Sequence, residues 1–296
     1  MKIVVTGSSG QLGSEVIKVI KKGSCTIGSI SKQYENADVI GINSRDLDIT
    51  NLNDVLKYFN DIKPNIIINT AAYTNVDDCE KNFEKAFNVN ALGARNVAMA
   101  SNEINAKLVH ISTDYVFDGA SQIPYREYDR GNPLTNYGKS KFQGEKYVQN
   151  FCSKYFIIRT AWLYGYEGKN FVKTILKAAK ENSYLEVVKD QRGNPTIVED
   201  LVYHLLKVAL SDEYGIYHCV GKGECSWYDF ANKIVEHAGI NCLIKPITSD
   251  KLNRVAGRPL FSVLDNMMLR TTIGDEMRNW EEALIEFIKK YGLVER

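Results

Sequence analysis

The stretch Ile3-Val4-Val5-Thr6-Gly7-Ser8-Ser9-Gly10-Gln11-Leu12-Gly13 decides the fold. It joins a short apolar run to a turn whose glycines follow the spacing G-x-x-G-x-x-G, and apolar residues then recur at helical spacing at positions 12, 16, 19 and 20. A helix that begins at such a turn presents free backbone N–H groups and the positive end of its dipole, which suits a pyrophosphate. A tight turn that binds nothing is the alternative, but the strand–turn–helix context favours a dinucleotide site.

The first half of the chain alternates between strand-like and helix-like segments. Apolar runs predict strands over residues 39–42, 65–69, 107–112 and 155–159. Helical spacing predicts helices after an N-cap at Thr50 or Asn51, near residues 80–104, and over about 135–150. This alternation predicts an α/β fold, a Rossmann-type doubly wound parallel sheet that binds ligands at the carboxyl ends of its strands.

The second half has longer loops and holds all three tryptophans. Its isolated strand and helix patterns predict a smaller mixed α/β lobe that faces the substrate. We therefore expect a dinucleotide-binding domain over residues 1–160, to which a helix near 197–210 returns, and a mainly substrate-binding lobe over residues 161–296.

The composition is that of an ordinary globular protein. Of the 296 residues, 44% are hydrophobic, 25% are charged and 10% are aromatic, so disorder is excluded as the main character of the chain. The 37 Lys and Arg residues nearly balance the 36 Asp and Glu residues, which gives a net charge of +1. Non-specific nucleic-acid binding needs an excess of positive charge, so no nucleic-acid partner is expected.

The sequence carries no zinc-binding or membrane-spanning pattern. The six cysteines form no C-x-x-C pair and the four histidines form no H-E-x-x-H motif, so we expect reduced structural thiols and no zinc site. No apolar run reaches about 18 residues, and the N-terminus leads directly into a strand. We therefore expect no membrane partner and a cytoplasmic location.

The motif Tyr-x-x-x-Lys occurs twice, at Tyr137/Lys141 and at Tyr203/Lys207. In a helix, both side chains of either pair lie on one face. The first pair follows the strand predicted to end near Ser112 and is therefore expected at the ligand edge of the sheet. The second lies in an apolar helix beyond the parallel strands, so Tyr203 is expected to be a packed, half-buried aromatic residue.

The first pair suits the reduction of a carbonyl group. A nicotinamide supplies a hydride and a phenol can supply the proton, provided that a neighbouring ammonium group lowers the phenol's pKa. Lys141 can serve that purpose and can also hold the nicotinamide ribose. A hydroxyl group from Thr113 or Ser112 can bond the carbonyl oxygen as negative charge develops there.

The end of the second strand bears on the choice between NADH and NADPH. An acidic residue there favours NAD and rejects a 2′-phosphate. Here Asn43 is neutral and Arg45 is nearby, which leaves room for NADPH, although Asp46 or Asp48 can point to the ribose instead.

Several segments beyond the glycine loop carry a family resemblance. They are Asn69-Thr70-Ala71-Ala72-Tyr73-Thr74-Asn75-Val76-Asp77, Ser112-Thr113-Asp114-Tyr115-Val116-Phe117-Asp118-Gly119, Tyr137-Gly138-Lys139-Ser140-Lys141, Arg159-Thr160-Ala161-Trp162-Leu163-Tyr164-Gly165, Asn170-Phe171-Val172 and Asp190-Gln191. With them the chain resembles the extended branch of the short-chain dehydrogenase/reductase superfamily, and most closely the dTDP-4-dehydrorhamnose reductases. The resemblance covers essentially the whole chain.

The resemblance implies a role for individual residues. The catalytic residues would be Thr113, Tyr137 and Lys141, with the last two also touching the cofactor. The other dinucleotide contacts would be Gly7, Gly10, Gln11, Leu12, Asp48, Ile49, Ala71, Ala72, Tyr73 and Thr74. Asp114 and Trp162 would touch the sugar, and Arg258 would lie near the nucleotide diphosphate. Many members carry His where Tyr73 stands here.

The activity implied is the NAD(P)H-dependent reduction of the C4 keto group of dTDP-4-dehydro-L-rhamnose to dTDP-L-rhamnose. The alternatives are another sugar-nucleotide epimerase, dehydratase or reductase of the superfamily, or a non-catalytic regulatory relative. Some members bind Mg²⁺ through glutamates at a homodimer interface, and Glu15, Glu199 and Glu281 match those positions, so the resemblance also implies a homodimer for this chain. Solvated surface carboxylates are the simpler interpretation of these three, so no metal site is assigned.

Four other features are interpreted as structural. Trp227 and Trp280 are expected to pack in the core, and His110 is expected to be a satisfied buried imidazole in its strand. The pair Asp77-Asp78 is expected to complement the positive end of a helix.

Overall fold

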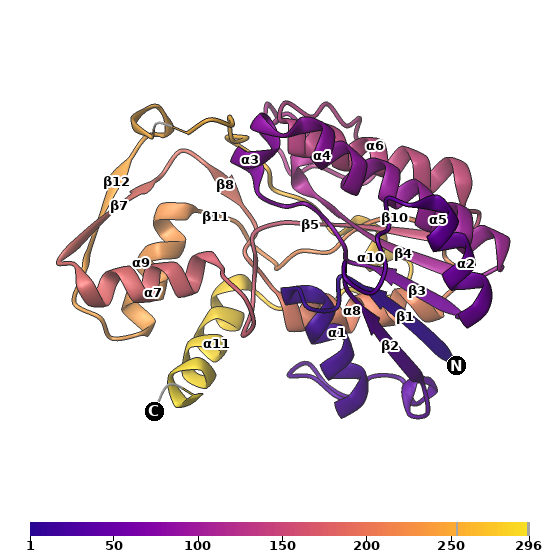
Figure 1. Ribbon diagram of the computed structural model, residues 1–296. Coiled ribbons are helices and arrows are strands. Elements are labelled where there is room, and N and C mark those ends of the chain that lie inside the picture. Colours follow the sequence, from indigo (N-terminus) through magenta and orange to yellow (C-terminus); the bar gives the residue numbers. More distant parts are fainter. Residues whose placement is uncertain (253, 295–296) are drawn as a thin grey trace.

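The computed structural model describes residues 1–252 and 254–294. Its centre is a six-stranded sheet in the order β2-β1-β3-β4-β5-β10, and every neighbouring pair is parallel (Figure 1). The strand order reverses at β1, which pairs with β2 on one side and with β3 on the other. The predicted fold class is confirmed. The strands are β1 (Lys2–Thr6), β2 (Asp38–Ile42), β3 (Ile66–Asn69), β4 (Lys107–Thr113), β5 (Tyr155–Thr160) and β10 (Gly215–His218).

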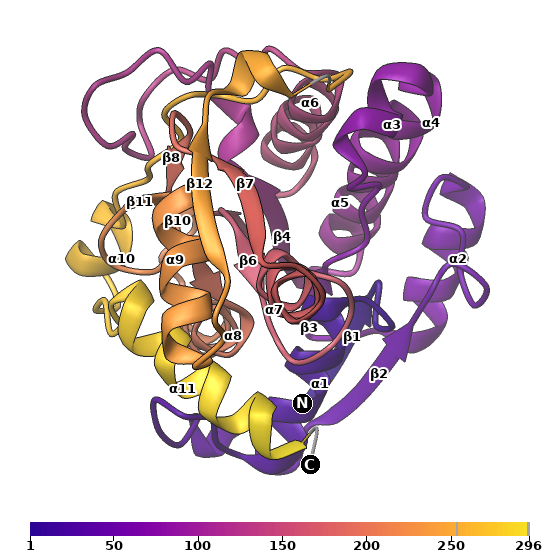
Figure 2. The same cartoon turned by 90° about the vertical axis from the view of Figure 1, so that its left-hand side faces the viewer.

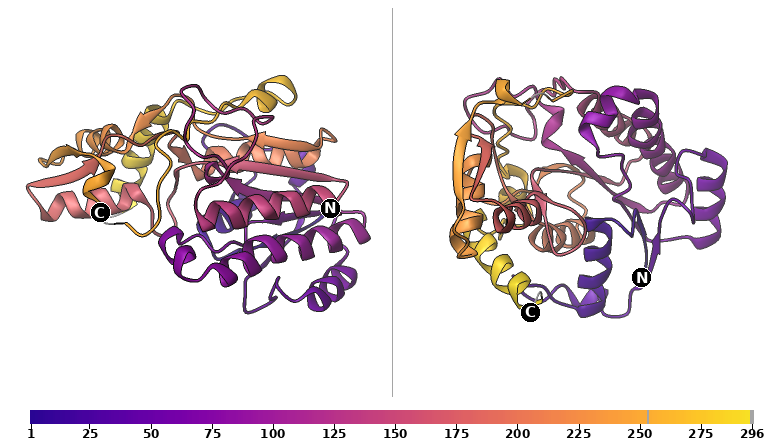
Figure 3. Two further views of the ribbon diagram at one scale, coloured as in Figure 1. Left: turned by 90° about the horizontal axis from the view of Figure 1, so that it is seen from above. Right: turned by 60° about the vertical axis from the view of Figure 1, so that its left-hand side comes forward.

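Alternation along each strand explains why helices cover both faces of the sheet. Successive side chains point to opposite faces, so Ile3 and Val5 join one apolar cluster whereas Val4 joins another. The first cluster packs against α1 (Gln11–Lys22) and α8 (Val198–Leu210). The second packs against α2 (Leu52–Ile62), α5 (Ala94–Glu103) and α6 (Asn136–Phe151), the last two of which lie side by side in Figure 3.

The caps of the helices follow local sequence. The Asn51 side chain accepts from Asn53 N and Asp54 N at the start of α2, and Thr135 accepts from Gly138 N at the start of α6. Gly10 caps α1 without any side-chain hydrogen bond. Helix α1 also approaches the preceding loop closely, because a Cβ atom on Gly13 would lie 2.5 Å from the carbonyl oxygen of Gly7.

The single helix predicted near residues 80–104 is wrong in detail. The segment holds α3 (Val76–Lys81), α4 (Phe83–Phe87), a π-helical turn (Asn88–Gly93) and then α5. Asn82 leaves the helical region with φ −127° and ψ 55°, which separates α3 from α4. Apolar periodicity does not report either interruption, because buried residues continue through both of them.

The smaller lobe, which faces the viewer in Figure 2, has its own apolar cluster, built around Phe230, Leu284 and Phe287. Helices α7 (Phe171–Glu181), α9 (Trp227–His237) and α11 (Trp280–Val294) supply most of it. They pack with the parallel pair β7 (Tyr184–Val188) and β12 (Leu243–Ile247). Other short elements are β6 (Leu163–Tyr164), β8 (Arg192–Gly193), β9 (Thr196–Ile197), β11 (Cys225–Ser226), α10 (Met267–Thr271), and the 3-10 turns Lys32–Tyr34, η3 (Asp114–Val116) and η4 (Ser249–Lys251).

Two expectations about the whole chain can be compared with this fold. All six cysteine thiols are buried and free. In the part of the chain that the structure describes, no helix combines the length and the apolar character that crossing a bilayer requires.

Helix α8 supplies the prediction that tests this packing. Leu205 is fully buried between α8 and the sheet, whereas Leu243 on β12 is 60% exposed. We expect Leu205→Ala to lower the free energy of unfolding by about 2–5 kcal/mol, because it leaves a cavity in the larger core. We expect Leu243→Ala to change it by less than about 0.5 kcal/mol. Denaturant unfolding measures both, and equal losses would contradict the assigned packing.

Candidate active site

Two adjoining cavities follow the carboxyl edge of the sheet. The smaller, of about 280 Å³, lies over the ends of β1, β2 and β3, and the larger, of about 600 Å³, lies over β4 and β5. Gly10, Thr70 and Ala72 line both of them. Together they form one trough that crosses the point where the strand order reverses, which is where doubly wound sheets bind ligands.

The glycine loop shapes the middle of this trough. Gly7 has φ +67°, and a Cβ atom there would lie 2.8 Å from the backbone nitrogen of Ala71. Gly10 leaves the first N–H groups of α1 without a side-chain partner, beside the positive end of the helix dipole. Backbone without side chains and a helix start without a cap together fit the diphosphate of a dinucleotide.

The residues expected to touch a dinucleotide divide between the two cavities. The smaller cavity is lined by Gly7, Gly10, Asp48, Ile49, Ala71 and Ala72. The larger cavity is lined by Gly10, Gln11, Leu12, Ala72, Thr74, Tyr137 and Lys141. Tyr73 lines neither. Its hydroxyl group donates to Asp78, and Lys85 Nζ lies 4.8 Å from its ring centre.

The end of β2 presents neutral groups as well as one acid to the smaller cavity. Asn43 and Ser44 line it, as does Asp48. Asp46 does not, because its carboxylate accepts a hydrogen bond of 2.9 Å from the backbone nitrogen of Asn43. Arg45 does not line the cavity either.

Thr113, Tyr137 and Lys141 converge on the larger cavity. Thr113 ends β4, and the other two lie one turn apart near the start of α6. The Tyr137 hydroxyl group is hydrogen-bonded to the Thr113 side chain. Lys141 Nζ donates to the carbonyl oxygen of Ile111 at 2.6 Å.

Of the two hydroxyl groups considered for the carbonyl oxygen, only one faces Tyr137. Ser112 Oγ donates to Glu145 Oε1 at 2.5 Å and is turned into the sheet–helix interface. Thr113 Oγ1 donates to Asp114 Oδ1 at 2.9 Å and contacts Tyr137. Thr113 is therefore the hydroxyl group placed to contact a reacting oxygen.

The protonation of this group differs from the sequence expectation. We expected Lys141 to lower the pKa of Tyr137. Instead, burial raises the pKa of Tyr137, and the Thr113 hydrogen bond is the contact that lowers it. Burial also lowers the pKa of Lys141 to about 8, although the Glu145 carboxylate raises it in part. Near neutral pH the phenol is thus protonated and Lys141 is mainly an ammonium group.

Asp114 is a buried carboxyl group in the cavity wall, with 2% of its surface exposed. Thr113 satisfies its Oδ1 oxygen, whereas its buried Oδ2 oxygen has no hydrogen-bond partner. Burial raises the pKa of Asp114 to about 6. An unpartnered acceptor in a cavity wall suits a ligand hydroxyl group, because such an atom is costly to leave unpaired.

Two stacked indoles form another part of the wall. The Trp162 and Trp227 rings lie 3.5 Å apart at 7°, and both line the larger cavity. Trp162 has a left-handed backbone with φ +47°, and its ring lies so close to Gly193 that a Cβ atom there would be 2.5 Å from it. The prediction that Trp227 belongs to the core is therefore incomplete. Trp280 is buried in the smaller lobe as expected.

Arg258 is held by α3 rather than pointing freely into the trough. Its Nη2 donates to Asp77 Oδ2 at 2.9 Å, and the backbone nitrogen of Ala256 donates to Asp77 Oδ1 at 3.1 Å. The segment after β12 reaches α3 in this way (Figure 1). Asp77 and Asp78 do lie in the first turn of α3, as expected, but Asp77 also ties the two parts of the molecule together.

Asn90, in the π-helical turn, is a functional candidate that sequence reasoning missed. Its side chain accepts from Tyr73 N at 2.8 Å and donates to Tyr73 O at 2.9 Å and to Ser140 Oγ at 3.0 Å. It thereby fixes the loop after β3 to the helix that carries Tyr137 and Lys141. No spacing rule points to Asn90, because the π turn shifts it out of helical register.

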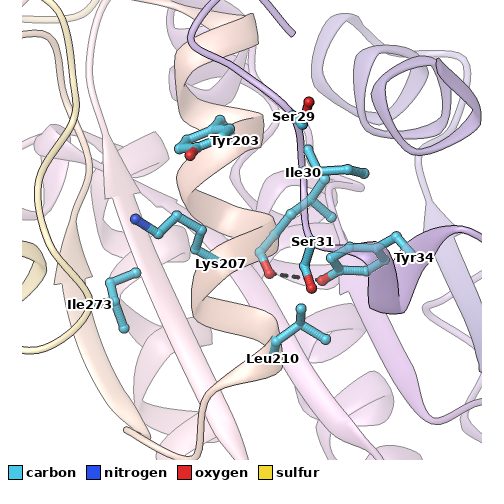
Figure 4. A pocket seen from close by; sticks show the side chains of 9 residues that line it. Ser29, Ile30, Ser31, Tyr34, Tyr203, Lys207, Leu210 and Ile273 are labelled. Atoms are coloured by element: carbon cyan, nitrogen blue, oxygen red, sulfur yellow. Dashed lines mark hydrogen bonds between the residues drawn. The ribbon is translucent and has the colours of Figure 1, made fainter. Parts of the chain in front are cut away.

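The second Tyr-x-x-x-Lys pair lies elsewhere, beside a cavity of about 460 Å³ on the outside of α8 (Figure 4). Lys207 Nζ is paired with Glu276 at 2.8 Å, and Tyr203 packs against the larger core. The expectation that Tyr203 is a packed, half-buried aromatic residue is confirmed.

His110 is buried, but only its Nδ1 has a partner, Asn69 at 3.1 Å.

The three glutamates considered for Mg²⁺ do not fit that ion. Glu15 is paired with Lys18 at 3.2 Å, and both oxygens of Glu199 accept from Thr26. Glu281 lies apart from them and is paired with Lys233 and His237. Within residues 1–252 and 254–294, no three His, Cys, Asp or Glu side chains are grouped to hold a metal.

Comparison with known proteins adds to this geometry. Residues 1–293 match the RmlD substrate binding domain family. The chain is 40% identical over 289 residues to the spore coat polysaccharide biosynthesis protein SpsK of Bacillus subtilis. The matched region covers 98% of this chain and 97% of that protein.

Two solved structures are similar over nearly their whole length. The dTDP-4-dehydrorhamnose reductase of Clostridium acetobutylicum is 45% identical with a TM-score of 0.93, and the match covers 100% of both chains. The dTDP-4-dehydrorhamnose reductase of Bacillus anthracis, solved in complex with NADP, is 40% identical with a TM-score of 0.91, over 98% of this chain and 99% of that one.

The buried carboxyl group yields a prediction about stability and pH. Below about pH 4 Asp114 is neutral in both the folded and the unfolded chain, so its burial costs little. Between about pH 4 and about pH 6 the group ionises in the unfolded chain but stays neutral in the folded one, so stability is lost over this range, and the loss is complete above the folded pKa of about 6. We expect Asp114→Asn to be more stable than the parent by on the order of 1–3 kcal/mol above pH 6, and nearly equal below pH 4. Denaturant midpoints across this range measure it; a gain that does not depend on pH would contradict the assignment.

The glutamate geometry yields a prediction about metal. We expect neither Mg²⁺ nor EDTA to change the thermal midpoint, because the Lys18 ammonium group already pairs with Glu15, and the backbone nitrogen and hydroxyl group of Thr26 already donate to Glu199. A midpoint that rises with Mg²⁺ in the parent but not in Glu199→Gln would show that the ion binds there after all.

Proposed function

Since the chain belongs to the dTDP-4-dehydrorhamnose reductase family, we propose that it reduces the C4 keto group of dTDP-4-dehydro-L-rhamnose to give dTDP-L-rhamnose, with NAD(P)H as reductant. The observation that carries this proposal is the convergence of Thr113, Tyr137 and Lys141 on a cavity that continues into the glycine-loop trough. There the Tyr137 hydroxyl group, which can donate a proton, lies beside a site shaped for a dinucleotide.

The chain's own residues divide the reaction among them. Bound NAD(P)H supplies the hydride that C4 receives. Tyr137 donates its proton to the C4 oxygen, and a raised pKa is no obstacle because an alkoxide is a far stronger base than a phenolate. Thr113 has one hydroxyl hydrogen, and it turns this hydrogen from Asp114 Oδ1 to the C4 oxygen as negative charge develops there. Lys141 contributes its positive charge and holds the nicotinamide ribose.

Substrate contacts come from the remaining wall of the larger cavity. Asp114 offers its unpartnered Oδ2 oxygen to a sugar hydroxyl group, and the indole of Trp162 gives the sugar an apolar surface. Trp227 supports that surface by stacking. Arg258 contributes to the nucleotide diphosphate site, where its pairing with Asp77 must be shared or broken.

We propose that NADPH is accepted at least as well as NADH. Asn43 and Ser44 at the end of β2 are neutral, and Asp46 is engaged with the backbone, which supports room for a 2′-phosphate. Asp48 is the one acid that lines this cavity, and it accepts from the backbone nitrogen and hydroxyl group of Thr50. The cytoplasmic location and the homodimer stay predictions.

The direct test follows the oxidation of NADPH and of NADH, in parallel, with freshly generated dTDP-4-dehydro-L-rhamnose. Oxidation that depends on the sugar nucleotide supports the proposal and ranks the cofactors. A folded protein that binds NADPH but does not oxidise it would refute the assigned reaction. If the protein is isolated with bound NAD⁺ and added NADPH gives no gain, an epimerase or a dehydratase becomes the better assignment.

Tyr137→Phe is the sharpest variant for the mechanism. Removing the hydroxyl group takes away the proton donor but none of the apolar contacts, so we expect kcat to fall by at least about 100-fold while NADPH affinity changes little. Tyr203→Phe, in the second Tyr-x-x-x-Lys pair, is the matched control and should retain parental kcat. Equal losses in the two variants would mean that the pair on α6 has no special part in the reaction.

A further inference from the structure

A buried ion pair lies directly behind Lys141. Glu145 follows Lys141 by one turn of α6, and its carboxylate accepts from Arg159 Nε at 2.9 Å and from Arg159 Nη2 at 2.7 Å. Ser112 adds a third hydrogen bond. The two charged side chains are 1% and 3% exposed. Such a pair is costly, because apolar residues of the same volume often stabilise a core equally well or better.

The position of the pair is informative because Lys141 has no direct ionic partner within residues 1–252 and 254–294. Lys141 is 2% exposed, and its ammonium group donates to a neutral carbonyl oxygen, that of Ile111. Burial favours the uncharged amine at such a place. Ser112, which follows Ile111, is the residue that bonds Glu145, so the carboxylate lies next to the strand position that holds the ammonium group.

Burial is what disfavours the ammonium form of Lys141. The titratable groups around Lys141 and Tyr137 come from four segments. They are Tyr137 and Glu145 from α6, His110 and Asp114 from β4 and the turn after it, Arg159 from β5, and Cys79 from α3. Arg159 is positive, and burial and Lys141 lower the pKa of His110, which leaves it neutral. The pKa of Asp114 is raised to about 6. Glu145 is the carboxylate whose charge stabilises Lys141.

We propose that Glu145 is a positioning residue for the reduction: its carboxylate, fixed by Arg159 and Ser112, keeps Lys141 charged inside the interface between β4 and α6. Arg159 and Ser112 hold the carboxylate in one place, so that its field acts at a fixed distance. The buried pair is then retained for its effect on Lys141. This inference rests on the role proposed above for Lys141.

The test uses Glu145→Gln, which keeps the shape of the side chain and removes its charge. NADPH affinity is measured as a function of pH by quenching of tryptophan fluorescence, and kcat is measured over the same range. Without the carboxylate, Lys141 should lose its proton at a pH lower by about one unit. NADPH affinity and kcat should then both begin to fall about one pH unit earlier than in the parent, with values approaching the parent's at acidic pH.

Controls separate this effect from a structural one. Glu84→Gln, on the exposed side of α4, should leave both pH profiles unchanged. Glu145→Asp keeps the charge but draws it back by one methylene group, so its alkaline fall should lie between those of Glu145→Gln and the parent. If Glu145→Gln does not fold because Arg159 is left unpaired, Glu145→Asp decides alone: withdrawal of the carboxylate should move the alkaline fall to lower pH by a smaller amount.

The outcomes are distinct for the two proposals. A folded Glu145→Gln protein whose NADPH affinity follows the parental pH profile would overturn the inference, whatever its kcat. The same holds for an unshifted Glu145→Asp if only that variant folds. Failure of the parent to turn over dTDP-4-dehydro-L-rhamnose would instead refute the proposed function, and the NADPH titration would still decide the role of Glu145.

Discussion

Parallel pairing of β1, β3, β4 and β5 is the constraint on which the site depends. It brings the carboxyl ends of strands that are far apart in the sequence to one edge, so Thr6, Asn69, Thr113 and Thr160 end neighbouring strands. Helices α1 and α6 then begin at that same edge. The first contributes free N–H groups to the trough, and the second contributes a phenol and an ammonium group. Without the parallel register, the N–H groups at the start of α1 would not lie in the same trough as the side chains at the start of α6.

The sheet and the central residues of the site could be predicted because they follow short-range rules. Short continuous apolar runs predict the strands, and the glycine spacing predicts the start of α1. The Tyr-x-x-x-Lys pair that lines the trough could be chosen from its place after β4. The structure puts Tyr137 beside Thr113 and puts Lys207 in an ion pair with Glu276, far from the trough.

What escaped prediction depends on contacts between distant segments. Trp227 begins a helix of the smaller lobe, so its sequence context predicts a core residue. The structure instead stacks it on Trp162 in the cavity wall. Asn90 reaches Tyr73 and Ser140 only because a π turn rotates it. The effect of Glu145 depends on Arg159, a residue of the next strand along the sheet. The burial that raises the pKa of Tyr137 is likewise a property of the assembled site.

The assignment of the reaction depends on where the hydride goes, so the most direct measurement follows it. The protein is given dTDP-4-dehydro-L-rhamnose and NADPH that carries deuterium at its transferable position, and the product is examined by NMR. The account predicts dTDP-L-rhamnose with one deuterium atom at C4 of the sugar. A product without deuterium at C4, or one altered at another carbon, would contradict it, because the trough would then bind the cofactor for a different reaction.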